Sequence, residues 1–428
     1  MTEPYLTDEP LDRAPKTPAE PKEAKAKAGD KKRFRPFLSY RLGPDPKRLD
    51  VLDGVRALCV GLVGWFHIWQ QSWWSPTLRL PWETISLDFL LRSGYLWVDG
   101  LLLLSGFLLY LPYTQAGSRL PAVGAFYKRR LIRIFPSYLL CVLPMFVMAC
   151  VGNAYASPSE AIGDLAAHLT FTHTLFPFSY YRSPINGALW TLAVEMQFYL
   201  LFPFLARAYK KAPAITYFCM TGLAFAFRLY AMRLEDSTMY YNQLPAFLDV
   251  YANGFAAASA FAALRKKLGA DMDGKIKLLF TALAVVCLCE LMQIARGQAA
   301  ASGAGYEGIR QGQMLRRCPL SVTLACLMVC LAFSAPWVRF LLGNKLMHFL
   351  SLISFQFYIY HQMLAVKLKE WGFPPSDSPT PWMEGDRPWQ IRYTVCCFVL
   401  ALALAALLTF LFERPIARAL RRKTKAEQ

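Results

Sequence analysis

Residues Leu49–Trp74 read LDVLDGVRALCVGLVGWFHIWQQSWW, and this stretch decides the fold. From Val55 to Trp69 it is almost entirely apolar, and with its flanks it is long enough to cross a bilayer as a helix. Arg56 stands at its start and His67 lies well inside it. Their separation is about three helical turns, or about 16 Å, so both project from nearly the same helix face at different depths. An ionisable group inside a span indicates a functional site, and a packing hydrogen bond to a neighbouring helix is the alternative for His67.

The composition of the whole chain indicates an integral membrane protein. The 428 residues are 55% hydrophobic and the mean hydropathy is +0.27, which is too apolar for an ordinary soluble protein. A net charge of +18 could suit nucleic acid, but the basic residues lie between hydrophobic runs, which fits membrane orientation and anionic lipid better. The eleven cysteines are scattered through apolar segments without a CxxC pair, so we expect neither a metal site nor a disulfide framework.

The chain is predicted to be an all-α polytopic bundle with a tail at each end. Residues 1–48 are rich in Pro, Ala, Lys and Glu and predict a disordered basic cytoplasmic tail. Residues 49–418 form the predicted transmembrane domain, and residues 419–428 a basic cytoplasmic C-terminal tail. Ten spans are expected, at about 51–73, 94–112, 131–151, 189–206, 213–231, 245–263, 277–295, 318–335, 346–366 and 391–412. Most of the 47 Lys and Arg residues fall in the tails and alternate loops, which predicts that both termini are inside.

This orientation converts sequence positions into membrane depths. Five ionisable residues from five spans are then expected in the outer half of the membrane: His67, Asp99, Glu195, Asp249 and His361. Carboxylates at such depth normally face a bundle interior or a watered cavity, so the simplest inference is one polar pocket open toward the outside. Each residue alone could be a structural polar contact. The outside loop 152–188 carries two further histidines and is expected to hold a re-entrant or interfacial helix.

The inner face carries a complementary basic cluster. The third span begins FYKRRLIRIFPSY, in which Arg130 and Arg133 are three residues apart and share a helix face near the depth of Arg56. An anchor of the positive-inside kind explains these residues without further function. The sharper interpretation is a phosphate-binding site, because the planar guanidinium group suits bidentate phosphate recognition.

The motifs along the chain resemble those of the membrane-bound acyltransferase 3 family. The resemblance covers nearly all of residues 49–418 and combines several short patterns in order. These are LDGVRALCVGLVGWFH with Arg56 and His67, GYLWVDGLLLLSGFLL with Asp99, FYKRRLIRIFPSY with Arg130 and Arg133, LWTLAVEMQFYLLFP with Trp190 and Glu195, FLDVYANGFAAA with Asp249, ISFQFYIYHQ with His361, and LTFLFERPIAR with Glu413 and Pro415. Thr191 replaces the usual Ser, and Met196 stands where a second acidic residue is common. The fused hydrolase-like domain of some members is expected to be absent.

The resemblance implies a plasma-membrane enzyme that moves an acyl group, usually acetyl, from cytoplasmic acyl-CoA to a hydroxyl of an extracytoplasmic carbohydrate or lipid-linked glycan of the cell envelope. Acyl-CoA is then a co-substrate, with no permanently bound cofactor. His67 is the expected general base or transient acyl carrier, because neutral imidazole can take a hydroxyl proton. Glu195, with Asp99 as alternate, is expected to orient it or act as a second acid–base group. Arg56, Arg130 and Arg133 are expected to bind acyl-CoA, and Trp190, Asp249 and His361 are candidates for the acceptor pocket.

Two other classes of function remain open from the sequence. A glycan or small-molecule transporter also places ionisable residues at mid-depth, but no internal repeat is evident and the Arg-x-x-Arg motif has no obvious role there. A membrane scaffold without chemistry leaves the shared depth of five ionisable groups unexplained. The acceptor sugar and the acyl group are not fixed by the sequence.

Overall fold

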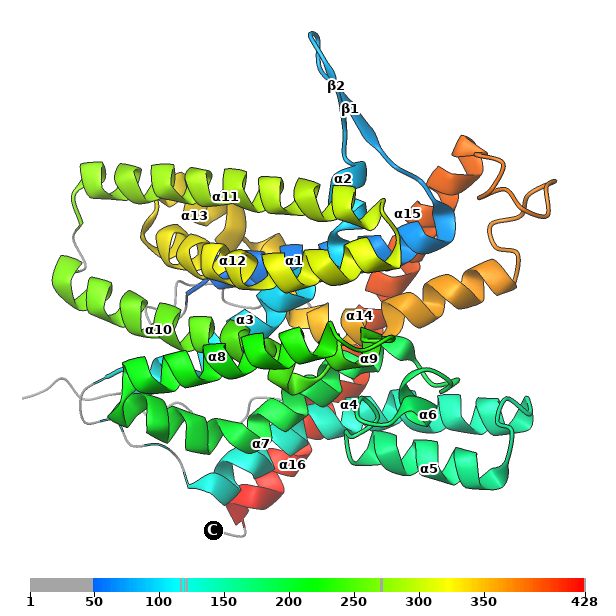
Figure 1. The fold of residues 1–428 in the computed structure, drawn as a ribbon, viewed down its shortest axis with the longest axis horizontal. Helices are drawn as coiled ribbons and strands as arrows, with labels where there is room; N and C mark the ends of the chain where they lie inside the picture. Colours follow the sequence, from blue (N-terminus) through cyan, green and yellow to red (C-terminus); the bar gives the residue numbers. More distant parts are fainter. Residues whose placement is uncertain (1–48, 116–117, 119, 121, 270–271, 427–428) are drawn as a thin grey trace, which may run out of the picture. The chain divides into compact units, whose positions relative to one another are not determined.

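The structure is a computed structural model that describes residues 49–115, 118, 120, 122–269 and 272–426. The predicted N-terminal tail, residues 1–48, lies outside the described residues. Long helices dominate (Figure 1). They are α1 (Val51–Ser72), α3 (Trp97–Tyr110), α4 (Val123–Val151), α7 (Trp190–Lys211), α8 (Pro213–Ala231), α10 (Leu248–Leu268), α11 (Gly274–Ser302), α12 (Tyr306–Phe333), α14 (Lys345–Glu370) and α15 (Arg387–Leu408).

Shorter elements connect or extend these helices. They are the strands β1 (Thr77–Arg79) and β2 (Thr84–Ser86), the helices α2 (Asp88–Arg92), α5 (Pro158–Leu169), α6 (Pro177–Tyr180), α9 (Thr238–Tyr241), α13 (Pro336–Gly343) and α16 (Arg414–Ala426), the 3₁₀ turns η1 (Gly94–Leu96), η2 (Leu111–Tyr113), η3 (Gly187–Leu189) and η4 (Leu244–Phe247), and the π-helical turn η5 (Thr409–Glu413).

Within the described residues, ten helical segments are long and apolar enough to cross a membrane, which confirms the predicted polytopic bundle. Each corresponds to one predicted span. The third starts earlier than expected, because α4 already begins at Val123 and carries its basic residues in its first turns. In the predicted basic C-terminal tail, residues 419–428, helix α16 continues as far as Ala426.

The helix ends follow ordinary capping chemistry. The side chains of Asp273, Asn344 and Asp386 each accept a backbone N–H at the start of α11, α14 and α15. Prolines lie inside α4, α7 and α12, where a membrane bundle tolerates them because neighbouring groups satisfy the freed carbonyls. Because water is absent from the bilayer core, every span must be helical to satisfy its own backbone.

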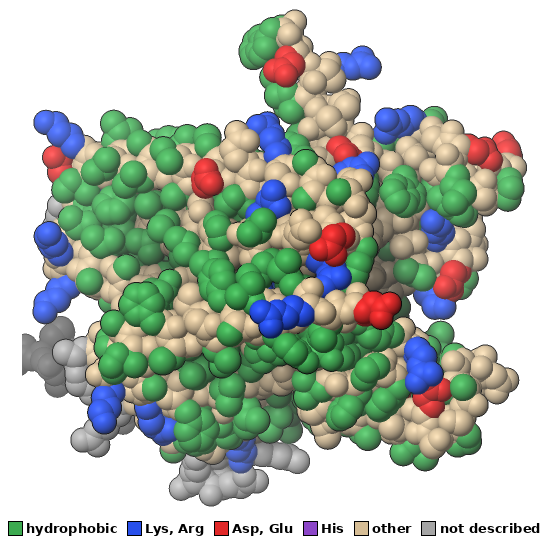
Figure 2. All heavy atoms as spheres, viewed as in Figure 1, with side chains coloured by type: hydrophobic (Ala, Val, Ile, Leu, Met, Phe, Trp, Pro, Cys, Tyr) green, Lys and Arg blue, Asp and Glu red, His purple; other side chains and the backbone are tan. Residues whose placement is uncertain are grey.

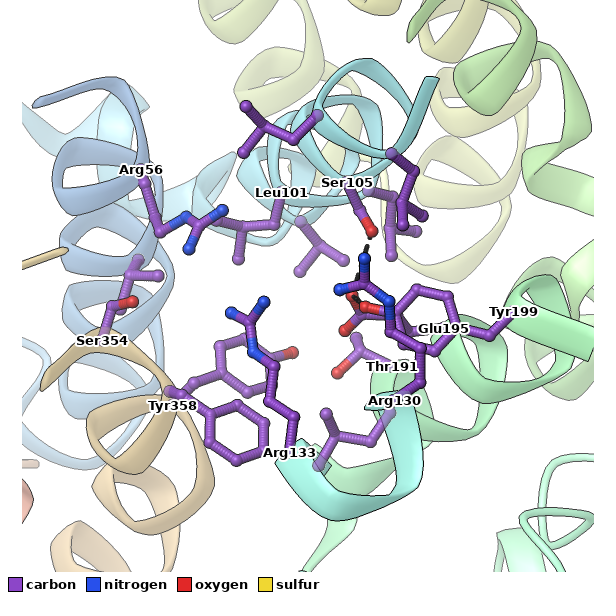
Figure 3. A pocket seen from close by; sticks show the side chains of 17 residues that line it. Arg56, Leu101, Ser105, Arg130, Arg133, Thr191, Glu195, Tyr199, Ser354 and Tyr358 are labelled. Carbon is purple, nitrogen blue, oxygen red and sulfur yellow. Dashed lines mark hydrogen bonds between the residues drawn. The ribbon is translucent and has the colours of Figure 1, made fainter. Parts of the chain in front are cut away.

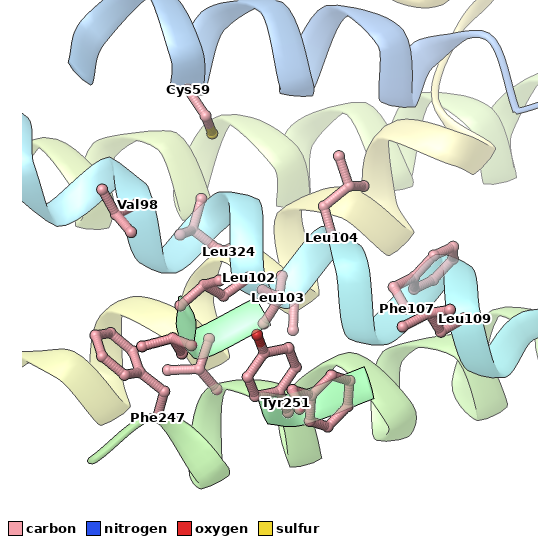
Figure 4. Packing of buried hydrophobic residues seen from close by; sticks show 14 of the residues in the cluster. Cys59, Val98, Leu102, Leu103, Leu104, Phe107, Leu109, Phe247, Tyr251 and Leu324 are labelled. Atoms are coloured by element: carbon pink, nitrogen blue, oxygen red, sulfur yellow. The ribbon is translucent and has the colours of Figure 1, made fainter. Parts of the chain in front are cut away.

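Small residues let the central helices approach closely. A Cβ on Gly254 of α10 would lie 2.6 Å from the Leu103 carbonyl oxygen and 2.8 Å from the Phe107 amide of α3. A Cβ on Gly64 of α1 would lie 2.5 Å from the Phe357 ring of α14. Such contacts drive association where lipid removes the hydrophobic driving force between helices. Tyr251, the leucines of α3 and Leu324 of α12 pack around this centre (Figure 4).

The remaining features are the exposed apolar surface of the helices and two long loops between spans. Exposed large apolar side chains cover α8 and α11, among them Ile215, Phe218, Leu278 and Val286, and Figure 2 shows apolar side chains across one face. The loop after α1 forms an unpredicted two-stranded antiparallel hairpin, with Leu78 opposite Ile85. The loop 152–188 contains the helices α5 and α6, in line with the expected helical content of that loop.

Candidate active site

A cavity of about 330 Å³ opens among α1, α3, α4, α7 and α14, and we call it the arginine pocket (Figure 3). Its polar lining comprises Arg56, Ser105, Arg130, Arg133, Thr191, Glu195, Tyr199, Ser354 and Tyr358. Its apolar lining includes Val60, Val98 and Leu101. The structure therefore brings together the three arginines that the sequence pattern placed at one depth, although they come from two helices far apart in sequence.

The three guanidinium groups give the arginine pocket an excess of positive charge. Among the described residues, Arg56, Arg130 and Arg133 have no ion-pair partner within 4 Å, and the buried Nε of Arg130 has no hydrogen-bond partner. Arg130 lies over the rings of Phe126 and Tyr199, each 5.3 Å away, which fixes the side chain. Three guanidinium groups beside the carboxylate of Glu195 leave a net positive charge in the lining, so this arrangement is suited to a bound polyanion.

Of the described residues that line the arginine pocket, one is a carboxylate, Glu195. Hydroxyl groups of neighbouring side chains hydrogen-bond to it. Ser105 of α3 donates to Glu195 Oε1 at 3.0 Å, and Tyr199, one turn further along α7, donates to the same oxygen. The carboxylate is therefore positioned by α3 and α7 at the edge of the cluster of guanidinium groups (Figure 3). The sequence did not reveal these hydroxyl partners, because Ser105 is 90 positions away.

A smaller recess of about 210 Å³ adjoins the arginine pocket on its inner side. Arg56, Arg133 and Ser354 line both cavities, and Asp53, His348 and Glu413 line the recess. Glu413 accepts a hydrogen bond of 2.8 Å from Gln356 of α14. The arginine pocket thus extends toward the ends of α1 and α15 that the charge pattern assigns to the cytoplasm.

A second cavity, of about 240 Å³, contains two of the other predicted residues, and we call it the histidine pocket. Its lining comprises His67, His168, His173, Ser179, Tyr180, Ser183, Ile185, Asn186, Gly187, Trp190, Asn242 and Gln362. The helices α1, α7 and α14 contribute, together with the outside loop 152–188. His67 and Trp190, which the sequence assigned to the catalytic and acceptor groups, therefore share one cavity.

His67 and His361 are neighbours beside the histidine pocket. Their ring centroids are 5.2 Å apart. Nδ1 of His67 lies 3.1 Å from the amide oxygen of Gln70 and therefore donates to it, which leaves Nε2 unprotonated in the neutral ring. Nδ1 of His361 donates to the carbonyls of Phe357 and Tyr358, and its buried Nε2 has no hydrogen-bond partner in the part of the chain that the structure describes. A carboxylate partner for His67 was expected, but the structure provides Gln70 instead.

Neighbouring residues of the same three helices line the two pockets. Trp190 lines the histidine pocket and the next residue, Thr191, lines the arginine pocket. On α14, Tyr358 lines the arginine pocket and Gln362, one turn later, the histidine pocket. On α1, the Val60 wall of the arginine pocket lies about 10 Å along the axis from His67. A ligand that fills one pocket therefore ends close to the other.

Three of the five expected site carboxylates and histidines line neither pocket: His361, whose ring lies beside that of His67, and the two aspartates. Asp99 is 2% exposed and accepts a hydrogen bond of 3.1 Å from Arg317 of α12. Asp249 is fully buried and forms a bidentate pair with Arg228 of α8, at 2.9 and 2.8 Å. The expectation of one pocket for all five groups is therefore wrong, because buried arginines neutralise these two carboxylates within the bundle.

The sequence analysis gave no role to the arginines of these pairs. Arg317 falls one residue before the expected span 318–335, whereas the structure places it in α12. Arg228 falls inside the expected span 213–231, and the sequence pattern named no partner for it. An arginine in an apolar span requires a counter-ion, and that signal could have predicted a pair with a buried aspartate.

Loop 152–188 supplies a polar cluster that the sequence analysis did not assign. The rings of His168 and His173 stack with centroids 4.2 Å apart and planes 1° apart. Nδ1 of His168 lies 2.9 Å from the Asp164 carbonyl and 3.2 Å from its carboxylate. Burial alone would raise the pKa of Asp164, but hydrogen bonds from His168, Ser179 and Ser183 outweigh it and hold that pKa below its usual value. Among the described residues, no group of three or more His, Cys, Asp or Glu side chains is arranged to hold a metal ion.

The fold and the pockets define a multi-pass membrane protein with polar cavities between its helices. The chain belongs to the acyltransferase 3 family, whose model, described as an acyltransferase domain, matches residues 49–413. It is also similar to acyltransferase MdmB from Streptomyces mycarofaciens, with 28% identity over 185 residues. That match covers 43% of this chain and 46% of the relative, so the chain spans less than half the length of that relative. No solved structure matches.

Proposed function

We propose that this protein is a membrane O-acyltransferase that moves an acyl group from cytoplasmic acyl-CoA to a hydroxyl of an extracytoplasmic carbohydrate or lipid-linked glycan. The observation that carries the proposal is the convergence of Arg56, Arg130 and Arg133 on one cavity without ion-pair partners among the described residues. Coenzyme A carries several phosphate groups, and guanidinium groups bind phosphate bidentately. Family membership supports the same chemistry, and acetyl is the acyl group that we favour.

The lining of the arginine pocket suits both the phosphate end and the thioester end of acyl-CoA. The guanidinium groups and the adjoining recess would hold the phosphates. The apolar wall formed by Val60, Val98 and Leu101 would accompany the donor arm toward the histidine pocket. Because the pockets adjoin at Trp190 and Thr191, a thioester at the outer end of this wall would lie near His67.

His67 is the proposed general base. The acceptor hydroxyl oxygen attacks the thioester carbonyl carbon while Nε2 of His67 takes the hydroxyl proton. The carbon–sulfur bond then breaks, and the thiolate that leaves takes the proton from the imidazolium ring, so that the products are the ester and the free thiol. In the alternative route, Nε2 of His67 carries the acyl group before the hydroxyl attacks. Gln70 fixes the tautomer in both routes.

The remaining predicted residues receive narrower roles. Glu195 lies in the arginine pocket, held by Ser105 and Tyr199, so we assign it to the donor side as an acid–base or orienting group. His361 is the second base candidate, because its Nε2 has no hydrogen-bond partner among the described residues and its ring centroid lies 5.2 Å from that of His67. We assign Asp99 and Asp249 to the stability of the bundle.

We further propose that the protein resides in the plasma membrane with both termini inside. The arginine pocket then faces the cytoplasmic acyl-CoA supply, and loop 152–188 faces the acceptor. A cysteine placed at the exposed Lys210 should react with maleimide only after permeabilisation, whereas one at the exposed Asn153 should react from outside. The reverse result would place the arginine pocket on the wrong side for cytoplasmic acyl-CoA.

The proposal is tested with purified protein in liposomes and acetyl-CoA labelled in the acetyl group. Label should pass to a glycan extract, and titration with CoA should show saturable binding. Uptake of glycan without any transfer of label would favour the transporter alternative. If the protein neither binds CoA nor transfers the label, the proposed function is rejected.

A further inference from the structure

His173 is a buried polar side chain with unmet hydrogen-bonding capacity. It is 4% exposed, it lines the histidine pocket, and neither ring nitrogen has a hydrogen-bond partner among the described residues. Backbone groups of Leu189 and Ala167 lie near the ring and favour its protonated form, but neither meets hydrogen-bonding geometry. A buried polar group without a partner costs free energy of folding, so a ligand that completes it gains that free energy on binding.

The surroundings of His173 hold the ring in place and keep it neutral. His168 stacks flat against it, and Asp164 anchors His168 through Nδ1. Burial and the nearby His168 lower the pKa of His173 to about 3. At neutral pH the ring therefore presents one N–H donor and one bare nitrogen acceptor, which is the complement of a hydroxyl group.

The rest of the histidine pocket also suits an uncharged polar ligand. The described residues that line it include no Lys, Arg, Asp or Glu. The amide oxygen of Gln362 is buried without a partner and adds a second open acceptor. Trp190 contributes an aromatic ring from the start of α7, on the side of the pocket that adjoins the donor cavity.

We propose that the histidine pocket is the acceptor site, that it takes an uncharged polyhydroxylated ring such as a neutral sugar, and that His173 hydrogen-bonds a hydroxyl of that ring. The assignment of the ligand as an acyl acceptor rests on the proposed function, but the binding of a neutral sugar by His173 does not. His168 and Asp164 are positioning residues that act through His173. An acceptor that carries a charge would lose its hydration in this pocket without finding a counter-ion.

The test is saturation-transfer NMR of methyl glycosides with the full chain in lipid nanodiscs. Methyl α-glucopyranoside should bind at least tenfold more tightly than the corresponding methyl glucuronide or methyl glucosaminide. His173→Phe keeps the stacked ring but removes both nitrogens, and it should weaken binding of the neutral glycoside at least tenfold. His173→Gln keeps a donor and an acceptor and should restore most of the affinity. Gln311→Ala, at an exposed position of α12 that lines neither pocket, is the control and should leave glycoside binding unchanged.

Thermal unfolding separates a binding role from a structural one. His173→Phe should raise the midpoint of unfolding, because it removes two unpaired buried nitrogens, whereas a structural histidine would lower it. Titration of each variant with CoA tests donor binding independently. If the protein binds glycosides but not CoA, the proposed acyltransferase function is rejected and the sugar site proposed here is retained. Equal glycoside binding by wild type and His173→Phe, preference for a charged glycoside, or no saturation transfer from any glycoside would overturn this proposal.

Discussion

Trp190 and Thr191 are consecutive residues of α7 that line different cavities. The short turn η3, capped by the side chain of Asn186, sets the start of α7 at this level, so the two side chains diverge where the cavities meet. Asn186 also donates to the Ile359 carbonyl of α14 at 2.5 Å, which ties the same point to the helix that carries His361. The junction between the cavities is therefore a rigid part of the bundle. In the proposed reaction, the donor thioester and the acceptor hydroxyl would meet there.

The arginines of α4 provide a test of donor binding. Arg130→Ala and Arg133→Ala should each weaken binding of acetyl-CoA by about 1.5–3 kcal/mol, the usual scale for a hydrogen bond to a charged group. Lysine at either position should recover only part of this, because it lacks the planar fork. The measurement is calorimetric titration of the purified variants.

Arg129→Ala is the matched control for these variants. Arg129 is exposed on the same helix and does not line the arginine pocket, so CoA binding should be unchanged. Unaltered CoA binding in a folded double variant of Arg130 and Arg133 would leave these residues only the anchoring role of the positive-inside rule.

If His67 is the general base, a substitution there should lower turnover without weakening the binding of acetyl-CoA. His67→Gln keeps size and hydrogen bonding but takes no proton at neutral pH, so turnover should fall by roughly 10²–10⁴-fold while acetyl-CoA still binds. Single-turnover assays with labelled acetyl-CoA measure the first quantity and calorimetry the second. In the acyl-carrier route, acetyl-CoA without acceptor should leave a transient adduct on His67 that rapid quench and peptide mass detect.

A folded His67→Gln protein with full transfer activity would remove the base from His67. His361 would then become the base, because its Nε2 is unpaired and its ring is adjacent. Gln311→Ala is the control, since that residue is exposed on α12 and lines neither pocket.

The ion pair of Asp99 and Arg317 should act on stability. Asp99→Ala leaves a guanidinium group that is only 3% exposed without its carboxylate, so the free energy of unfolding should fall by about 3–5 kcal/mol. The double variant Asp99→Leu/Arg317→Met should recover most of this loss, because it removes both charges. Gln311→Ala, at an exposed position of α12, should change little. If Asp99→Asn loses turnover but keeps its stability, Asp99 has the catalytic role expected from the sequence.

The contact between α3 and α10 predicts a steric effect at one glycine. Gly254→Ala places a Cβ against backbone atoms of Leu103 and Phe107 that have no rotamer to adjust, so it should destabilise the bundle by about 1–3 kcal/mol. Gly222→Ala in α8 is the matched control, because nothing lies within 4 Å of the added Cβ. Thermal unfolding in the same detergent compares the two, and equal midpoints would contradict the close packing of α3 and α10.

The sequence by itself determined the spans and the basic end of the site. Apolar runs of this length must become helices, because lipid offers no partner for an open backbone. Arg130 and Arg133 share a face through the helical repeat alone, and their common depth with Arg56 follows from the order of the spans. These properties are local, so short stretches such as LDGVRALCVGLVGWFH and FYKRRLIRIFPSY were sufficient to predict them.

The tertiary structure decided which ionisable groups are neutralised and which remain available. Equal depth placed Asp99 and Glu195 together in the sequence analysis, but depth does not specify direction around the bundle axis. Asp99 turns to Arg317, 218 positions away, whereas Glu195 turns to the cavity and to Ser105. His173 likewise joins His67 in one cavity only because loop 152–188 packs beside α1 in the folded protein. The physical reason is that pairing of charges depends on contacts between helices remote in sequence, which no local periodicity encodes.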